Sequence, residues 1–203
     1  MKSIRLVLIL SICIQASAFA VFAQNAIVSF DLSQLTSGVL SDTITASDGT
    51  TELTVSARQA NDSAKTIFTT SSGLRTFHTN SNTKSVVFNF NTDVILESYR
   101  ISLASPLFAG DERFILNLSG TNYDENFPVD NSNLTGQTLT FNNKLTIPAG
   151  TNIEIIAHNP DDGAETLYWN RLTVTVVPEP ETYALILAAL ALTYTALRRR
   201  RIR

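Results

Sequence analysis

The chain of 203 residues contains one cysteine, one tryptophan and two histidines. The cysteine, Cys13, lies in an N-terminal apolar stretch, so the rest of the chain offers no thiol chemistry and no disulfide. His78 and His158 are far apart in sequence, which is more typical of surface or strand-end residues than of a metal pair. A His-Glu-x-x-His zinc motif and a Gly-x-Ser-x-Gly nucleophile motif are both absent. These absences remove the usual sequence evidence for thiol, zinc or serine-nucleophile catalysis.

Residues 1–23 are typical of a secretory signal peptide. Lys2 and Arg5 form a short basic region, and the apolar run Leu6 to Ile14 follows it. Small residues come next, as they do before a cleavage site. We expect signal peptidase to cleave after Ala23, with Ala18 and Ala20 as alternative positions. The chain is therefore predicted to be exported.

A second apolar stretch, residues 182–197, carries no charge, and ten of its sixteen residues are Ala or Leu. As a helix it is about 24 Å long at about 1.5 Å per residue, slightly short of a hydrocarbon core of about 30 Å. Arginines hold the C-terminal end of a membrane helix in the cytoplasm. Such a cluster follows this stretch directly: Arg198, Arg199, Arg200, Arg201 and Arg203. We therefore predict a single transmembrane helix over residues 182–197.

The residues before this helix are Val177-Pro178-Glu179-Pro180. With the apolar helix and the terminal arginines they resemble the PEP-CTERM sorting signal of Gram-negative bacteria, over residues 178–203. The resemblance implies recognition by an exosortase, a membrane-embedded cysteine protease-transpeptidase that cuts near the motif. It also implies release or re-attachment outside the inner membrane, and association with exopolysaccharide and biofilm matrix. Pro178, Glu179 and Pro180 are then the substrate of another enzyme, held extended by the two prolines. The alternative is an ordinary C-terminal anchor preceded by prolines.

The segment between the two ends, residues 24–177, has the length of one domain with its own core. It contains 8 Lys and Arg against 16 Asp and Glu, so its formal net charge is −8. A domain this acidic is a poor partner for nucleic acid or anionic membrane surfaces. Divalent cations and neutral sugars are more compatible with it.

The composition and the period-2 alternation of residues 24–177 predict an all-β domain. Gly, Asn, Asp and Pro residues mark turns between the expected strands. About ten short strands in such a length favour a two-sheet β-sandwich of jelly-roll type. The expected strands are Ala26–Leu32, Asp42–Ala46, Thr51–Ala57, Thr66–Thr70, Leu74–His78, Ser85–Phe90, Ser98–Leu103, Phe114–Ser119, Thr138–Phe141, Asn152–His158 and Arg171–Val176.

Acidic residues are candidate catalytic groups, because sandwich glycosidases place two carboxylates on either side of one sugar. Glu97 and Glu154 each stand alone on an expected strand. The adjacent pairs Asp111-Glu112, Asp124-Glu125 and Asp161-Asp162 lie near turns and are interpreted as solvated loop carboxylates. No pair has the spacing that catalysis requires, so we predict no catalytic residues.

A loop rich in oxygen ligands extends from Asn159 to Glu165 and contains Asp161 and Asp162. Calcium prefers six to eight such oxygens, although this spacing is not that of an EF-hand. Asp161, Asp162 and Glu165 are therefore a candidate calcium site. A solvated turn is the alternative interpretation, and no other metal or cofactor is predicted.

Four residues of the last strand are candidate glycan contacts: Tyr168, Trp169, Asn170 and Arg171. Trp169 has the parity of the polar residues Arg171 and Thr173, whereas Tyr168 shares the face of Leu172. In an unbulged strand, Trp169 therefore points outward, where an indole flanked by Asn and Arg can stack on a sugar. The alternative is that Trp169 caps the edge of the core.

The sequence thus predicts an exported, non-enzymatic extracellular or cell-surface protein, first anchored in the inner membrane and associated with exopolysaccharide. A dedicated carbohydrate-binding module and a polysaccharide-active enzyme are the alternatives. The expected partners are signal peptidase and exosortase during processing, the inner membrane before cleavage and extracellular polysaccharide afterwards, without nucleic acid.

Overall fold

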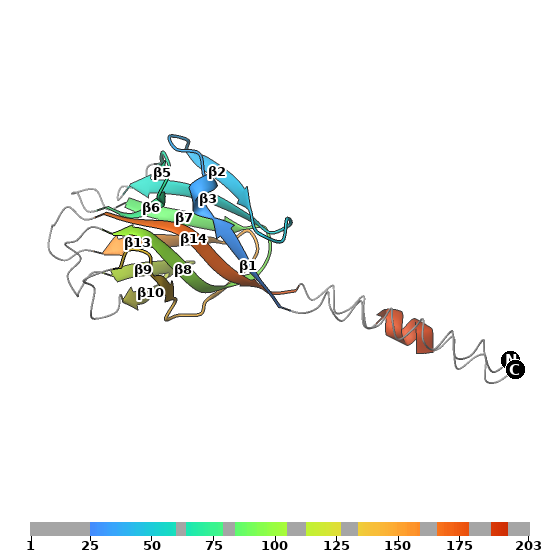
Figure 1. Cartoon of the computed structure of the whole chain (residues 1–203). Helices are drawn as coiled ribbons and strands as arrows, with labels where there is room; N and C mark the ends of the chain where they lie inside the picture. Colours follow the sequence, from blue (N-terminus) through green and yellow to red (C-terminus); the bar gives the residue numbers. More distant parts are fainter. Residues whose placement is uncertain are drawn as a thin grey trace, which may run out of the picture. The chain divides into compact units, whose positions relative to one another are not determined.

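The computed structural model describes residues 25–59, 64–78, 84–104, 113–126, 134–158, 166–178 and 188–194. Residues Ile27–Val176 form one compact unit, and the residues before and after them are grouped apart from it. The described part of the compact unit consists mainly of β-strands in two antiparallel sheets (Figure 1). The prediction of an all-β sandwich is therefore confirmed.

Every strand expected from the sequence overlaps an observed one. The sequence did not predict β4, β10, β12 and a short 3-10 helix, η1. The elements are β1 (Ala26–Asp31), η1 (Leu32–Gln34), β2 (Ser41–Thr45), β3 (Glu52–Gln59), β4 (Ala64–Lys65), β5 (Thr69–Thr70), β6 (Gly73–His78), β7 (Lys84–Phe90), β8 (Val94–Ala104), β9 (Arg113–Leu118), β10 (Thr121–Asn126), β11 (Thr138–Thr140), β12 (Thr146–Ile147), β13 (Asn152–His158) and β14 (Thr166–Val176).

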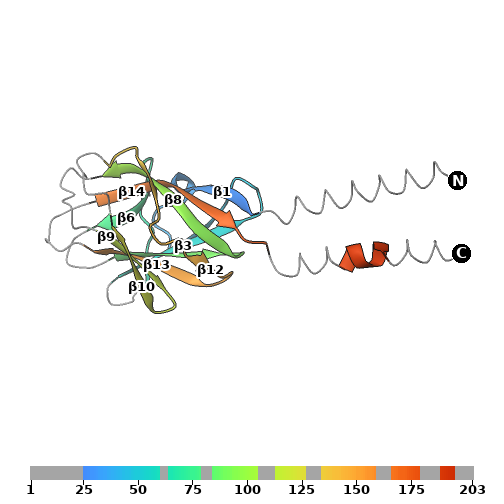
Figure 2. The ribbon, with the colours of Figure 1, turned by 90° about the horizontal axis from the view of Figure 1, so that it is seen from below.

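The strands form two layers, which Figure 2 shows from below. Sheet A has the order β11-β8-β14-β6-β5, with β1 also paired to β14 and β12 also paired to β8. Sheet B has the order β10-β9-β13-β7-β3-β2, with β4 also paired to β3. Strands that are neighbours in a sheet are mostly distant in sequence, so the fold depends on long-range pairing.

The core lies between the sheets and follows the alternation of the strands. In β13, Ile153 and Ile155 are fully buried, whereas Asn152 is exposed on the other face. Burying one large apolar side chain stabilises the fold by roughly 1.5–3 kcal/mol. The largest fully buried side chains come from both sheets and from η1: Trp169, Phe30, Phe88, Phe90, Phe114, Leu32, Leu53, Ile67, Leu74, Leu96 and Ile101.

The central strands of sheet A, β8 and β14, lie side by side and are each 11 residues long. Their pairing changes register, because Trp169 lies opposite Ile101 and Arg171 opposite Arg100. Asn170 therefore has no residue opposite it and forms a β-bulge. A bulge of one residue reverses which side chains face the core on its two sides.

The C-terminal part of the chain is described only in two short pieces. Val177 and Pro178 follow β14 without regular structure, and residues 188–194 are helical. Within that helix the Thr193 hydroxyl donates to the Ala189 carbonyl over 2.7 Å. Among the residues that the structure describes, no helix is long and apolar enough to cross a membrane. The rest of the predicted span 182–197 and the predicted signal peptide 1–23 lie outside the described residues.

Candidate functional site

Trp169 was expected to point outward, and this expectation is wrong. Its side chain is 0% exposed and lies among aromatic residues of both sheets. Its ring stacks on Tyr99 at 4.2 Å between centroids and meets Phe114 edge-on at 5.0 Å. Phe141 and Phe88 lie at 6.0 and 6.3 Å. The indole thus has no face available for a sugar, and Trp169 is a core residue.

The physical reason for the error is the bulge at Asn170. Before it, the inward residues of β14 are Leu167 and Trp169; after it, they are Leu172 and Val174. Strict alternation counted back from Leu172 would point Trp169 outward, but the extra residue at the bulge turns it inward. The same reversal places Tyr168, which was expected to face the core, on the outer face of sheet A.

Close contact between β6 and β14 accompanies the bulge. Gly73, the first residue of β6, has a φ of +111°, and a Cβ built on it is 2.2 Å from the Trp169 carbonyl oxygen. The Ser102 hydroxyl of β8 donates to the Ser72 carbonyl and, over 3.3 Å, to the Tyr168 carbonyl. These contacts fix the backbone of β14 around Tyr168.

Tyr168 belongs to a row of side chains that crosses sheet A on its outer face. Arg75 of β6 lies opposite Tyr168, and the Arg75 amide donates to the Phe68 carbonyl over 3.0 Å. The Arg75 guanidinium covers the Phe68 ring at 4.0 Å from its centroid, a cation–π contact. Partial burial lowers the pKa of Arg75, and the nearby Tyr168 acts in the opposite direction. The guanidinium stays charged in either case.

Beside this row, the segment before β2 is hydrogen-bonded to the segment before β5. The Gly38 amide donates to the Ile67 carbonyl, and the Ile67 amide donates to the Val39 carbonyl. With φ +86° at Gly38, this is the pattern of a G1 bulge. Ile67 is buried, whereas the next residue, Phe68, is 43% exposed, and Leu40, which follows Val39, is 59% exposed.

Arg171 and Arg100 lie directly opposite each other on β14 and β8. Both side chains are exposed, and the outer face they share is the one that carries Tyr168. Asn170, at the bulge between Tyr168 and Arg171, is half-buried, and its Oδ1 has no hydrogen-bond partner within the described residues. Of the four predicted glycan contacts, Arg171 is exposed, Tyr168 and Asn170 are half-buried, and Trp169 is buried in the core.

Sequence reasoning missed Phe68, Arg75 and Arg100 as members of this face. A usable signal was present in the Ser72-Gly73 turn. Pairing the short strands on either side of that turn places Phe68 beside Arg75, as observed. The position of Arg100 depends on the bulges in β8 and β14, which periodicity does not reveal.

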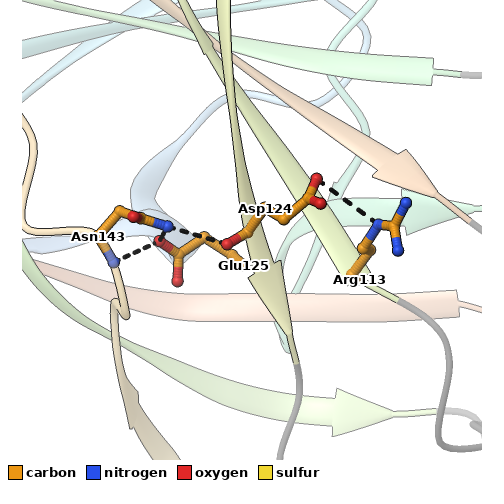
Figure 3. A network of polar contacts seen from close by, with 4 residues as sticks. All are labelled: Arg113, Asp124, Glu125 and Asn143. Atoms are coloured by element: carbon orange, nitrogen blue, oxygen red, sulfur yellow. Dashed lines mark hydrogen bonds and ion pairs between the residues drawn. The ribbon is translucent and has the colours of Figure 1, made fainter.

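Glu125 was interpreted as a solvated loop carboxylate, and this is wrong. It lies in β10, opposite Phe114, and its side chain is only 2% exposed. Figure 3 shows Asn143, from the loop after β11, beside Glu125. The amides of Asn142 and Asn143 donate to its two oxygens over 2.6 and 2.7 Å, and Asn143 Nδ2 donates over 2.8 Å. Charge-assisted bonds of this kind compensate for burying a carboxylate.

Asp124, the neighbour of Glu125, faces the opposite side of β10. It forms an ion pair with Arg113 of 3.6 Å on the outer face of sheet B. Both side chains are at least one-third exposed, so the pair contributes little to stability. The Asp124 carbonyl accepts a bond from Asn143 Nδ2 over 2.9 Å, which ties the same loop to β10.

The negative charge of Glu125 also acts on the aromatic cluster. Burial raises the pKa of Tyr99 above its usual range, and the nearby Glu125 carboxylate raises it further. Tyr99 therefore stays neutral throughout the physiological range. Its role is to pack between Trp169 and Phe141, whose ring centroids lie 4.2 and 4.9 Å away.

Glu97 and Glu154 lie on different sheets and do not face one sugar. On the outer face of sheet A, Glu97 accepts bonds of 2.7 Å from Lys144 Nζ and from the Thr175 hydroxyl. These bonds hold the pKa of Glu97 below its usual value. Glu154, on the outer face of sheet B, accepts a hydrogen bond from the Ser85 hydroxyl. Each carboxylate thus ties neighbouring strands together.

Several predicted site residues lie outside the described residues. They are Glu179 and Pro180 of the sorting motif, Arg198, Arg199, Arg200, Arg201 and Arg203, and the calcium candidates Asp161, Asp162 and Glu165. Pro178 is described, is half-buried and follows β14 at a distance of two residues. Within the described ranges, no group of three or more His, Cys, Asp or Glu side chains is arranged to hold a metal ion.

We compared the chain with protein-family models, with curated proteins and with solved structures, and none of the three comparisons finds a match.

Proposed function

We propose that this is an exported, non-enzymatic protein of the cell surface or extracellular matrix, delivered by a C-terminal PEP-CTERM signal. The observation that carries the proposal is the boundary of the folded unit. The compact unit ends at Val176, the last residue of β14, and the Pro-Glu-Pro motif begins two residues later. A protease that cuts near the motif then removes the tail without cutting a strand.

The proposed sandwich is of jelly-roll type. The order β6-β14-β8-β11 in sheet A and the order β7-β13-β9-β10 in sheet B support this. Taken in chain order from β6, successive strands alternate between the two sheets except at the β9-β10 hairpin in sheet B and at β11 and β12, which both pair with β8 in sheet A. β14 returns beside β6. Two interleaved Greek keys give this arrangement.

In the precursor, residues 182–197 span the inner membrane, with the arginines from Arg198 in the cytoplasm. Support comes from the helical residues 188–194, which lie in the middle of the span, and from its uncharged composition. Signal peptidase and exosortase are the processing partners. The mature protein meets extracellular polysaccharide, and its net charge of −8 argues against nucleic acid.

The hydrogen bonds of the described carboxylates to neighbouring loops and strands support a non-enzymatic role. Glu125 holds the loop after β11, Glu97 holds Lys144 and Thr175, and Glu154 holds Ser85. Asp48 and Asp93 accept bonds from backbone amides of turns. These carboxylates stabilise loops and strand neighbours.

The experiment replaces Pro178, Glu179 and Pro180 with alanine in the full chain and follows the protein by cell fractionation. We expect an uncut precursor that stays in the inner membrane. Glu181→Ala, which changes a charge just outside the motif, is the matched control and is processed normally. If the triple variant is cut and released as efficiently as the control, the sorting proposal fails.

A further inference from the structure

The outer face of sheet A combines two aromatic rings, the exposed Phe68 and the half-buried Tyr168, with arginines. Phe68, just before β5, forms one row with Arg75 of β6 and Tyr168 of β14. Arg171 and Arg100 lie further along β14 and β8. Tyr168 and Arg171 are successive outward residues of β14 because the bulge at Asn170 lies between them. Rings and guanidinium groups thus share one face.

The position of Arg100 directly opposite Arg171 needs a physical explanation. Like charges directly opposite each other in a sheet destabilise it. Ion pairs among the described residues include those of Arg113 with Asp124 and of Lys144 with Glu97, and neither of them includes Arg100 or Arg171. In a domain with a net charge of −8, two arginines that face each other without an ion pair to a described acid favour an external anion as their partner.

The groups on this face define the chemistry of that anion. A guanidinium fork matches a carboxylate through two parallel hydrogen bonds. An exposed ring offers an apolar face on which the C–H side of a pyranose ring can lie, as it does for other flat ligand groups. A polymer of uronic acids supplies both features, with at most one carboxylate per sugar. Nucleic acid carries about one charge per 1.7 Å of duplex and is repelled more strongly by the acidic domain.

We propose that the outer face of sheet A, centred on Tyr168, Arg171 and Arg100, binds a carboxylated polysaccharide. Arg100 and Arg171 bind carboxylates, Tyr168 stacks on a sugar ring, and Arg75 with Phe68 extends the surface. The backbone is already held in place, because Ser102 bonds to the Tyr168 carbonyl and Gly73 packs on the Trp169 carbonyl. This inference specifies the polysaccharide of the proposed function and rests on it for its biological setting.

The test measures binding of the full chain, purified in detergent micelles, to immobilised polygalacturonate, with neutral dextran as the reference. Every variant keeps the same arginine-rich tail, so the tail's own attraction for polyanions is constant. We expect the Arg100→Gln/Arg171→Gln double variant to bind polygalacturonate about fivefold to thirtyfold more weakly. The matched control is Arg58→Gln/Arg113→Gln, which makes the same charge change on the outer face of sheet B. It should bind as the unmodified chain does.

Variants of Tyr168 distinguish stacking on a glycan from general attraction between charges. Tyr168→Ala should weaken binding by about threefold to tenfold, whereas Tyr168→Phe keeps the ring and the affinity. Circular dichroism of each variant establishes that the sheets are retained.

Three results overturn the inference: equal losses in the two arginine pairs, no effect of Tyr168→Ala, or the same arginine dependence with duplex DNA or anionic vesicles. None of them bears on processing, and a failure of the Pro178-Glu179-Pro180 test leaves this binding assay unaffected. The two proposals therefore fail separately.

Discussion

Tyr99 and Trp169 stack across the two central strands of sheet A, with ring centroids 4.2 Å apart and an angle of 21° between the rings. Phe114 of sheet B meets the same indole edge-on at 5.0 Å. The only tryptophan of the chain therefore joins the two layers of the sandwich. This position depends on the bulge at Asn170, which turns Trp169 inward and Tyr168 outward.

The first prediction concerns the fluorescence of Trp169. A fully buried indole should emit at short wavelength and resist quenching by iodide, because neither water nor the ion reaches the ring. An unbulged strand places the ring in solvent and predicts the opposite. The emission maximum and the iodide quenching constant of the full chain, measured before and after unfolding in urea, decide between the two. Strong quenching in the folded state contradicts the structure.

Periodicity predicted the strands well because long-range pairing preserves the alternation within each strand. Ile153 and Ile155 of β13 face the core as their spacing indicates. Trp169 could not be placed in this way, since a bulge is set by neighbouring strands and not by β14 itself. Gly73 lies almost one hundred residues before Trp169, yet it allows the backbone contact beside the bulge.

The second prediction tests that contact at Gly73. In Gly73→Ala the new Cβ lies 2.2 Å from the Trp169 carbonyl oxygen at a φ of +111°, so a strand must move. We expect a loss of about 3 kcal/mol or more in the free energy of unfolding.

Gly120→Ala is the control for Gly73→Ala. Gly120 also has a positive φ, +87°, but nothing lies within 4 Å of its added Cβ. It should lose only about 1 kcal/mol, the cost of the left-handed backbone. Urea unfolding followed by circular dichroism measures both variants, and equal losses contradict the proposed clash.

The third prediction concerns the carboxylate of Glu125. Glu125→Gln keeps the shape of the side chain but presents an NH₂ group to amide donors that need an acceptor. We expect a loss of about 1–3 kcal/mol in the free energy of unfolding. Asp124→Asn makes the same chemical change on the exposed side of β10 and should cost at most about 1 kcal/mol. A neutral effect of Glu125→Gln contradicts the role of the Glu125 carboxylate in holding the loop after β11.

The sequence alone could not predict the burial of Glu125. Adjacent acids suggest a loop, and here only one of the two faces solvent because a strand alternates. The Asn142 and Asn143 amides that satisfy Glu125 come from a loop that pairing brings to β10. Such donors have no sequence signature, whereas the turn at Asp48-Gly49 was recognisable from its residue types.

The fourth prediction concerns the turn at Asp48-Gly49 and the pH dependence of folding stability. Burial opposes ionisation of Asp48, but the Thr51 hydroxyl and the amides of Thr50 and Thr51 donate to it and lower its pKa to about 2. Because the folded pKa lies below the unfolded value of about 3.9, the contribution of Asp48 to the free energy of unfolding is fully present only above about pH 5. It is lost as the pH falls towards about 2.

Carbon-13 NMR titration of the Asp48 carboxyl group measures this pKa directly. A value near the ordinary 3.8 contradicts the hydrogen bonds described for the turn. Asp48→Asn should remove this part of the acid sensitivity of folding while leaving the sandwich intact at neutral pH.

The central claim of the account is that an exported β-sandwich is separated from its sorting tail at the boundary after β14. Mass spectrometry of the protein in the producing cells and their medium tests this most directly, because it fixes both termini of the mature form at once. We predict an extracellular or surface species that begins after one of the alanines near Ala23 and ends close to Pro178-Glu179-Pro180. A full-length chain of 203 residues that fractionates as a freely soluble cytosolic protein contradicts it.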